Sequence, residues 1–329
     1  MVFIGYEDKT NGEFVATGTG FFVGRDLIDG RIATYIVTAE HNIQKIRDQG
    51  ALDVLIRLNL RAGGAKNIPI AHGLWTRNTR KADVAVIQLA IDEEMDHLCF
   101  PLKSFVSKES IVEENIGVGS EVSITGLFKP HNGWTKNVPI IRVGVIAAMD
   151  EEEVSTNEHG RISAYLIEAR SIGGLSGSPV MVHSPPVRIK DGHTEIAKTT
   201  GFFLLGLVHA HFDVDESKVD AAVGRGRDQI NMGIAIVVPW YDILETLNSP
   251  HLLKHEGDMK SAMSFEKARR EQMEALNKQL KSERSDNNCF PSQSCCFRAG
   301  TIIFSGLGVE QIGHLTTGKR AAVGKQDSD

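Results

Sequence analysis

Short apolar runs separated by turn-forming residues fill the first three quarters of the chain. β-branched and aromatic residues dominate these runs, which is typical of strands. The runs fall into two groups of about six, at residues 12–103 and 116–240, with little helical periodicity between them. A doubly wound sheet would need helices between its strands, so the pattern predicts an all-β fold of two packed β-barrels.

The periodicity becomes helical after the second group. Pro239 opens a segment, 239–247, that predicts a helix, because proline is well tolerated in a first helical turn. Residues 256–286 are charge-rich and free of proline, and their apolar residues recur at three- and four-residue steps, which predicts an amphipathic helix with one thin apolar stripe. The stripe consists of Met259, Met263, Met273, Leu276 and Leu280. Residues 287–329 show no sustained period, and we expect a flexible tail there.

Charge and hydropathy exclude several classes of protein. The net charge is −6 and no basic stripe is visible, so we expect no nucleic-acid partner. No apolar stretch reaches the roughly 18–20 residues that a membrane span needs, so we expect no membrane association. If Met1 is the true start, the absence of a basic and then apolar leader also argues against a cleaved signal peptide.

The cysteines indicate the compartment. Three of the four, Cys289, Cys295 and Cys296, lie in the expected tail, and only Cys99 lies in the expected globular region. One cysteine cannot form an internal disulfide, which fits a reducing environment. We therefore expect a cytoplasmic location.

Three short segments carry candidate chemistry. His41 ends a β-run that closes with Thr-Ala-Glu-His, and Asp83 opens the apolar strand 82–87. Ser176 lies in a Gly-Gly-Leu-Ser-Gly-Ser-Pro loop just before another strand. Taken alone, each has an ordinary structural explanation as a strand end, a turn residue or a glycine-rich loop.

Together the three residues match the needs of nucleophilic catalysis. A serine hydroxyl needs a neighbouring base, and a buried carboxylate holds an imidazole in the right tautomer for that task. The order is His41, Asp83, Ser176, which is the order of the double-barrel peptidases. The Gly-x-Ser-x-Gly nucleophile elbow is not met, because Ser178 occupies the place of its last glycine.

The glycines beside Ser176 suggest an oxyanion hole. Acyl transfer places negative charge on a carbonyl oxygen, and backbone N–H groups stabilise that charge. The N–H groups of Gly174 and Ser176 can point into one pocket, because glycine at 174 permits the unusual dihedrals that this requires.

These motifs resemble those of the trypsin-like, chymotrypsin-fold serine peptidases. The likeness covers about residues 12–248 and is nearer to the bacterial glutamyl endopeptidases and HtrA-type proteases than to secreted digestive enzymes. The segments that carry it are 18–23, 37–41, 82–87, 174–180 and 231–239.

The resemblance implies one peptidase domain, residues 1–250, built of two six-stranded antiparallel β-barrels with the active site between them. His41 and Asp83 would come from the first barrel and Ser176 from the second. It implies a serine endopeptidase that cleaves protein or peptide substrates and needs no cofactor. Leu175 stands where many relatives carry an aspartate that locks a cleaved N-terminus, so we expect no activation of that kind. We also expect no PDZ-like second domain.

The resemblance also suggests where substrate would bind. A strand around Leu207, Val208, His209 and Ala210 would pair with an extended substrate and form a wall of the S1 pocket. Arg170, near the pocket floor, would favour an acidic P1 side chain; a surface ion pair is the alternative for Arg170. His209 stands one residue past the place expected for a pocket histidine, and a shift of one residue turns a side chain to the opposite face.

One competing pattern concerns metal binding. His209, His211 and Asp213 alternate along a strand, which could place three ligands on one face for zinc, as in the metallo-β-lactamase-like hydrolases. Val214 stands where those enzymes have their next histidine, so we expect no metal.

Two functional hypotheses remain open. The first is a serine endopeptidase acting through an acyl-enzyme intermediate. The second is a protease-fold binding or regulatory module, latent until a partner binds, with the helix at 256–286 recruiting that partner.

Overall fold

The computed structural model describes residues 1–131, 133–149, 152–156, 160–169, 174–184, 187–190, 193–196, 201–215 and 229–286. The chain divides into two compact units, Met1–Glu271 and Gln272–Asp329, and all the strands belong to the first. The expected tail, 287–329, lies outside the described residues.

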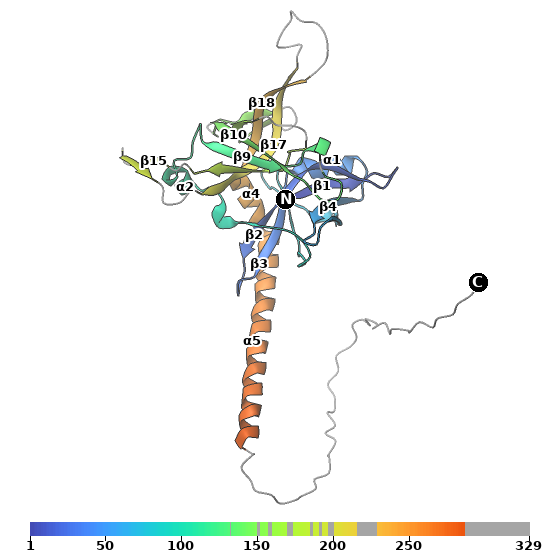
Figure 1. The fold of residues 1–329 in the computed structure, drawn as a ribbon, viewed down its shortest axis with the longest axis vertical. Coiled ribbons are helices and arrows are strands. Elements are labelled where there is room, and N and C mark those ends of the chain that lie inside the picture. The colour runs from blue at the N-terminus through green and yellow to red at the C-terminus, as the bar shows by residue number, and fades with distance from the viewer. Residues whose placement is uncertain are drawn as a thin grey trace, which may run out of the picture. The chain divides into compact units, whose positions relative to one another are not determined.

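Eight strands from the N-terminal part form the first sheet (Figure 1). Their hydrogen-bonded order is β5-β4-β1-β2-β3-β7-β6, and β8 pairs with β2 in parallel. In the described residues this path ends at β5 and β6, so the sheet is a half-barrel. The strands are β1 (Val2–Glu7), β2 (Phe14–Asp26), β3 (Ile32–Thr38), β4 (Asp53–Asn59), β5 (Ala65–Ala71), β6 (Thr76–Arg77), β7 (Ala85–Gln88) and β8 (Phe100–Pro101).

The first sheet departs from the expected six strands beginning near residue 12. β1 lies before that point and pairs with both β2 and β4, so it is central to the sheet. Its residues Val2, Phe3 and Ile4 are fully buried. The strands β6 and β8 have two residues each, which is too short to produce a recognisable apolar run.

The second group of strands forms a closed barrel in the order β10-β13-β18-β17-β14-β9, with every pairing antiparallel. This confirms the six-stranded barrel and, with the first sheet, the all-β chymotrypsin-like architecture. Two hairpins lie outside the barrel: β11 (Val154–Thr156) with β12 (Gly160–Ile162), and β15 (Val187–Lys190) with β16 (His193–Ile196). The barrel strands are β9 (Glu121–Gly126), β10 (Ile140–Ala148), β13 (Tyr165–Glu168), β14 (Pro179–His183), β17 (Phe202–Asp215) and β18 (Gln229–Pro239).

Short helices connect the strands, and two helices follow the barrel. α4 begins directly after Pro239, and α5 contains the segment 256–286 that the sequence predicts as helical. On α5, Met259 and Met263 are half-buried, whereas Met273 and Leu276 are more than half exposed. The helices are α1 (Glu40–Asp48), α2 (Lys108–Glu113), α4 (Trp240–Leu247) and α5 (Pro250–Asp286), with 3₁₀ turns η1 (His72–Leu74), η2 (Leu102–Ser104) and η3 (Lys129–His131).

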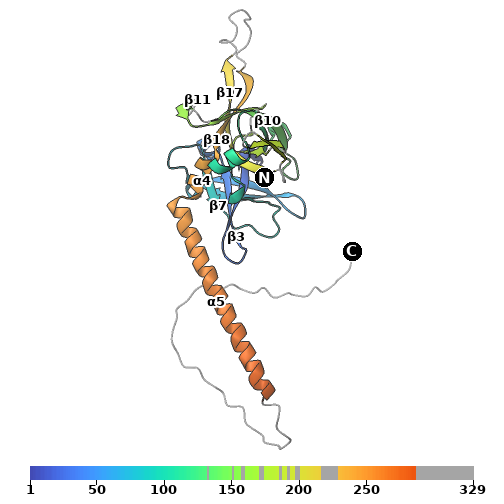
Figure 2. The same cartoon turned by 90° about the vertical axis from the view of Figure 1, so that its left-hand side faces the viewer.

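The core has three apolar clusters, and the middle one joins the two sheets. Phe22 and Ile36 of β2 and β3 point into the first sheet's own cluster. Their neighbours Phe21 and Tyr35 point the other way, into a cluster shared with β14, β17, β18 and α4. Because both faces of β2 and β3 are buried, these strands are nearly continuous apolar runs. Figure 2 shows the barrel strands above the first sheet, with α4 beside their junction.

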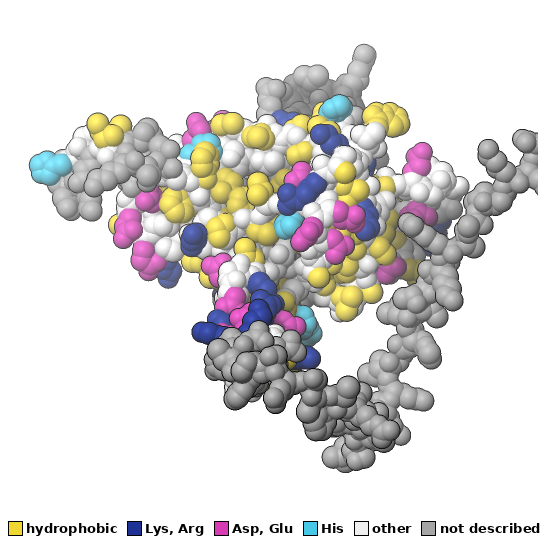
Figure 3. Space-filling model, turned by 60° about the horizontal axis from the view of Figure 1, so that its bottom comes forward, with side chains coloured by type: hydrophobic (Ala, Val, Ile, Leu, Met, Phe, Trp, Pro, Cys, Tyr) yellow, Lys and Arg dark blue, Asp and Glu magenta, His cyan; other side chains and the backbone are white. Residues whose placement is uncertain are grey.

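The surface drawn in Figure 3 is mixed in charge. Lysine and arginine side chains lie among aspartate, glutamate and apolar groups, so this face carries no patch of a single sign. None of the helices in the described part of the chain combines the length and apolar composition that a membrane span needs.

A buried ion pair attaches the start of α5 to the first sheet. Glu256 is 3% exposed, lies 3.2 Å from the Arg25 Nε atom of β2, and accepts a hydrogen bond from the Tyr35 hydroxyl of β3. Arg25 also donates to the Leu247 carbonyl at the end of α4. Removing one partner of a buried pair leaves the other charge uncompensated, which is costly.

We therefore expect Glu256→Ala to lower the free energy of unfolding by about 3 kcal/mol. The melting temperature would fall by about 6–12 °C. The matched control is Glu266→Gln on the same helix, whose partner Arg31 is exposed, and it should change stability by less than about 1 kcal/mol. Equal effects of the two substitutions in thermal or urea unfolding would contradict the buried attachment.

Candidate active site

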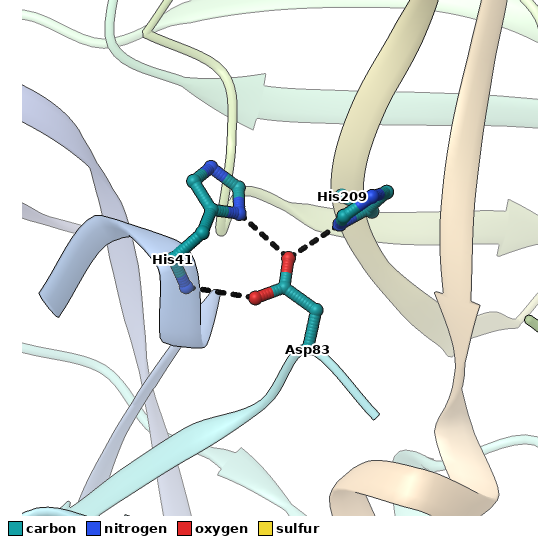
Figure 4. Close-up of side chains that lie close together, drawn as sticks. All are labelled: His41, Asp83 and His209. Atoms are coloured by element: carbon teal, nitrogen blue, oxygen red, sulfur yellow. Dashed lines mark hydrogen bonds and ion pairs between the residues drawn. The ribbon is translucent and has the colours of Figure 1, made fainter. Parts of the chain in front are cut away.

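Asp83 is the residue on which the candidate site converges (Figure 4). It lies two residues before the first residue of β7, and its side chain is buried. The preceding loop is shaped by Asn78, whose side-chain oxygen accepts the backbone N–H groups of Arg80 and Ala82. The side-chain nitrogen of Asn78 donates to the Asp242 carbonyl of α4. The loop thus links the first sheet to α4 and fixes Asp83 at the junction of the two sheets.

His41 is the second residue of α1, which begins immediately after β3. The N-cap residue Ala39 has no side chain that could cap the helix, and Asp83 takes that role from a distant part of the chain. Its Oδ1 accepts the His41 backbone N–H at 2.8 Å, and its Oδ2 lies 2.7 Å from His41 Nδ1. One carboxylate therefore satisfies an otherwise unpaired helix N–H group and orients the imidazole on the same residue.

The electrostatics of Asp83 follow from these contacts. Burial by itself raises the pKa of a carboxyl group. For Asp83 this is outweighed by the charge of His41 and by the hydrogen bonds from His209 and His41, so the pKa of Asp83 lies well below its ordinary range. Asp83 is therefore a carboxylate at neutral pH and accepts hydrogen bonds with both oxygens.

Ser176 is held by the backbone of its loop. Its carbonyl oxygen accepts hydrogen bonds from the Thr19 backbone N–H at 2.9 Å and from Asn42 Nδ2 at 3.0 Å. Since Asn42 directly follows His41, this second bond ties the serine peptide to the start of α1. The next N–H, of Gly177, donates to the Val208 carbonyl of β17 at 2.7 Å.

The glycines at 174 and 177 have positive φ angles, of 105° and 82°. A Cβ at Gly177 would lie 2.2 Å from the Thr19 carbonyl oxygen and 2.5 Å from Thr38 Oγ1, so no other residue fits. The Gly174 carbonyl accepts a hydrogen bond from Thr19 Oγ1 at 3.0 Å. Thr19, which the sequence patterns did not single out, is thus buried against the whole loop.

The structure therefore brings the three predicted residues to the junction between the first sheet and the barrel. His41 and Asp83 are 7% and 4% exposed, whereas Ser176 is only half-buried. Of the three residues, Ser176 is therefore the most exposed to solvent and Asp83 the least.

His209 occupies a different place from the one expected. Its ring is 2% exposed, and its Nδ1 lies 2.5 Å from Asp83 Oδ2, so it does not line a substrate pocket. The reason is a β-bulge: Val208 pairs with Val237 and Ala210 with Ile236, which leaves His209 as the extra residue on β17. A bulge re-aims a side chain, and strict alternation along a strand cannot foresee it.

The other expected substrate-binding residues have mixed outcomes. The side chains of Leu207 and Val208 are buried in two different apolar clusters, so any part that these residues take in substrate binding is through their backbone, and the expected pocket wall stays a prediction. Ala210 is half-buried. Arg170 lies outside the described residues.

The described residues contain one group of metal-ligand type, formed by His41, Asp83 and His209, whose ligand atoms lie within 4.8 Å of one another. The two nitrogens lie 2.7 and 2.5 Å from the same oxygen. Those are hydrogen-bond distances, shorter than the roughly 3.3 Å between ligands of a tetrahedral zinc ion with bonds of about 2.0–2.1 Å. The geometry is that of a hydrogen-bonded cluster. Moreover, β17 has a second irregularity between His211 and Asp213, which breaks the alternation on which the zinc pattern depended.

Comparisons with solved structures find similar folds at low identity. The MamO protease domain from Magnetospirillum magneticum is 14% identical, with a TM-score of 0.45, 75% of this chain covered and 95% of that chain. The HtrA-type protease AlgW with a decapeptide is 15% identical, with a TM-score of 0.43, 76% of this chain covered and 56% of that one. Deg5 is 18% identical, with a TM-score of 0.41, 74% of this chain covered and 84% of that one. No protein-family model matches the chain, and no curated protein matches it.

The close packing at Gly177 gives a first test of the site. Gly177→Ala combines backbone strain with a clash against Thr19 and Thr38, and we expect it to lower the free energy of unfolding by more than about 3 kcal/mol. Gly119→Ala is the matched control, because Gly119 also has a positive φ but has open space around its Cα, and strain alone costs about 1–2 kcal/mol. Urea unfolding of both variants measures the difference. Equal losses would show that the loop is not packed as described.

The low pKa of Asp83 gives a second test. A carboxyl group whose pKa is lower in the folded state stabilises the fold at pH values above its unfolded pKa, near 3.8, and this contribution is lost as the pH falls below that value. We expect Asp83→Asn to be less stable than the parent at pH 7, with a difference that narrows as the pH is lowered from 5 toward 3 (about the range of ordinary carboxyl groups). Urea unfolding at each pH measures this. A difference that stays constant over the range would contradict the ionised, hydrogen-bonded Asp83.

Proposed function

We propose that the protein is a serine endopeptidase that hydrolyses protein or peptide substrates through an acyl-enzyme intermediate. The observation that carries the proposal is the buried hydrogen bond between His41 Nδ1 and Asp83 Oδ2, beside a serine loop tied to the next residue, Asn42. An imidazole whose Nδ1–H donates to a carboxylate has its Nε2 lone pair available as a base.

In this proposal Ser176 is the nucleophile and His41 is the general base. Ser176 Oγ attacks the substrate carbonyl carbon while His41 Nε2 takes the hydroxyl proton. Asp83 remains a carboxylate and stabilises the imidazolium. The imidazolium then gives its proton to the leaving amine, whose C–N bond breaks. Water, deprotonated by His41, attacks the acyl-enzyme in the second half of the reaction and releases Ser176.

The oxyanion would be stabilised by the backbone N–H groups of Gly174 and Ser176. The positive φ of Gly174 supports this assignment, because it is a conformation that other residues rarely adopt. A single donor of this kind contributes about 2.7–4 kcal/mol to lowering the barrier. Thr19 donates hydrogen bonds to the Gly174 and Ser176 carbonyls, in the peptide groups that follow the two donors, which supports a loop held in one conformation during the reaction.

The substrate would bind in an extended form along β17. The pairing of β17 with β14 ends at Leu207, opposite Pro179, and Val208 is bonded to Gly177 and Ser178 of the serine loop, so the following residues of β17 would be available to an added strand. A peptide that added to this strand would place its scissile bond at the serine. A preference for an acidic P1 residue, as in the glutamyl endopeptidases, would depend on Arg170. The expected cytoplasmic location depends on the single cysteine of the globular part, Cys99, which is a free thiol.

The second candidate is a latent protease-fold module that is controlled by a partner. Its support is the exposure of Met273 and Leu276 on α5, since large apolar side chains on a helix are typical of contact surfaces. Both candidates share the same site, and they differ in whether the isolated protein reacts.

A fluorophosphonate probe tests the proposal, because it reacts with an activated serine and needs no knowledge of the natural substrate. We expect the full chain to be labelled, and Ser176→Ala and His41→Ala each to lower the labelling rate at least about a thousand-fold. Ser264→Ala, on the exposed face of α5, is the matched serine control and should be labelled like the parent.

The possible failures are distinct. A folded parent that is not labelled would contradict the active endopeptidase and favour the latent module. Hydrolysis that survives Ser176→Ala but stops with a chelator would favour metal chemistry instead.

A further inference from the structure

Asp83 is shared between two histidines from different parts of the fold. His41 belongs to α1 and His209 to β17, and the Nδ1 atoms of both rings point at the same oxygen, Oδ2 (Figure 4). The ring centroids are 5.6 Å apart, and the ring planes are nearly perpendicular, at 85°. The reaction proposed above uses only one of these imidazoles.

The protons in this arrangement are fixed by the carboxylate. An ionised carboxylate only accepts hydrogen bonds, so each Nδ1 within hydrogen-bond distance of Oδ2 must carry the proton. Asp83 thus selects the same tautomer in both rings. In return, His209 donates a hydrogen bond to Asp83 Oδ2 from the barrel strand β17. The side chain of Asp83 is therefore held between α1 and the barrel.

We propose that His209 is a positioning residue for the hydrolytic reaction: its Nδ1–H holds the Asp83 carboxylate in line with His41, and a second proton on its ring removes part of the support that Asp83 gives to His41. The proposal rests on the function proposed above. His209 is assigned no contact with the reacting atoms, because its ring is 2% exposed and its Nδ1 lies against Asp83 Oδ2.

The charge balance explains why a second proton matters. During attack His41 becomes an imidazolium, and the single negative charge of Asp83 compensates it. If His209 is also protonated, one carboxylate faces two cations at close range in a buried site, where charges interact strongly. The transition state then loses part of its stabilisation, so lowering the pH should slow the reaction more steeply than protonation of His41 alone would.

Several of the other titratable groups on elements near β17 are paired with residues other than His209. β18 contributes none in Gln229–Pro239, and Glu40 of α1 is paired with Arg77. His183 of β14 is paired with Glu121. It lies opposite Phe202, seven residues before His209 on β17. On α4, Asp242 and Glu245 bind Arg80. The remaining ones are Lys103 of η2, Tyr241 of α4, and His211, Asp213 and Asp215 of β17.

Two substitutions at 209 separate the positioning role from a role in binding. Asparagine can place an N–H donor where His209 Nδ1 stands but cannot become a cation, whereas leucine has similar bulk and no donor. With a fluorophosphonate probe, we expect His209→Leu to lower the maximal inactivation rate by about 10–100-fold while the half-saturating probe concentration changes little. His209→Asn should recover most of that rate. Circular dichroism and thermal unfolding establish that both variants are folded.

The pH dependence gives a signature that a purely structural role would not move. On the acid side, the logarithm of the inactivation rate should rise with a slope greater than one in the parent and of about one in His209→Asn. A slope of one in both proteins, or equal losses in the two variants, would overturn the proposal. So would a His209→Leu variant that raises the half-saturating concentration and keeps the maximal rate, because that is the behaviour of a pocket wall.

Nuclear magnetic resonance of the histidine-labelled full chain tests the geometry without any reaction. We expect two far-downfield Nδ1–H resonances in the parent, only the His41 resonance in His209→Asn, and neither in Asp83→Leu. A single such resonance in the parent overturns the role of His209 even if the protein is labelled by the probe. Two resonances without labelling would instead show that the proposed function, and with it the reaction that His209 serves, is wrong.

Discussion

The buried charge of Asp83 is the constraint around which the two halves of the fold are arranged. A carboxylate that is 4% exposed is stable only if its oxygens are fully hydrogen-bonded. Here three donors meet it: the backbone N–H and Nδ1 of His41, and the Nδ1 of His209. The first two come from α1 and the third from the barrel, so the requirement to satisfy one charge fixes the distance between the first sheet and β17.

The serine loop follows from the same junction. Its backbone is bonded to Thr19 of β2, to Asn42 beside His41, and to Val208 beside His209. Each histidine therefore has a chain neighbour that holds the loop. The positive φ angles of Gly174 and Gly177 let the backbone turn sharply enough to make these bonds on both sides. The position of Ser176 is thus set by main-chain contacts, and the residue is only half-buried, in contrast to His41 and Asp83.

Much of this could be predicted from the sequence, for identifiable reasons. The strands whose apolar residues run continuously or alternate were found, because burial on one or two faces leaves a periodic trace. The positions of His41, Asp83 and Ser176 were found because each stands at the end of such a strand or in a glycine-rich loop. β1, and the two-residue strands β6 and β8, were missed because the first lies at the chain start and the others are too short to show a period.

The error at His209 has a physical cause. Its expected orientation assumed an unbroken strand, and the bulge between Val208 and Ala210 reverses the face on which the ring lies. Nothing in the local sequence marks this bulge. Asn42 and Thr19 were missed for a similar reason, since their roles depend on contacts with residues more than a hundred positions away along the chain.

The most direct test of the account is a crystal structure of the protein after reaction with a fluorophosphonate. The account predicts a phosphonyl group on Ser176 Oγ, with one of its oxygens about 2.7–3.1 Å from the N–H nitrogens of Gly174 and Ser176. It also predicts that His41 Nε2 faces the adduct while the Nδ1 atoms of His41 and His209 both remain on Asp83. An adduct on another residue, or one whose oxygen turns away from Gly174 with the His41 ring displaced from Asp83, would contradict it.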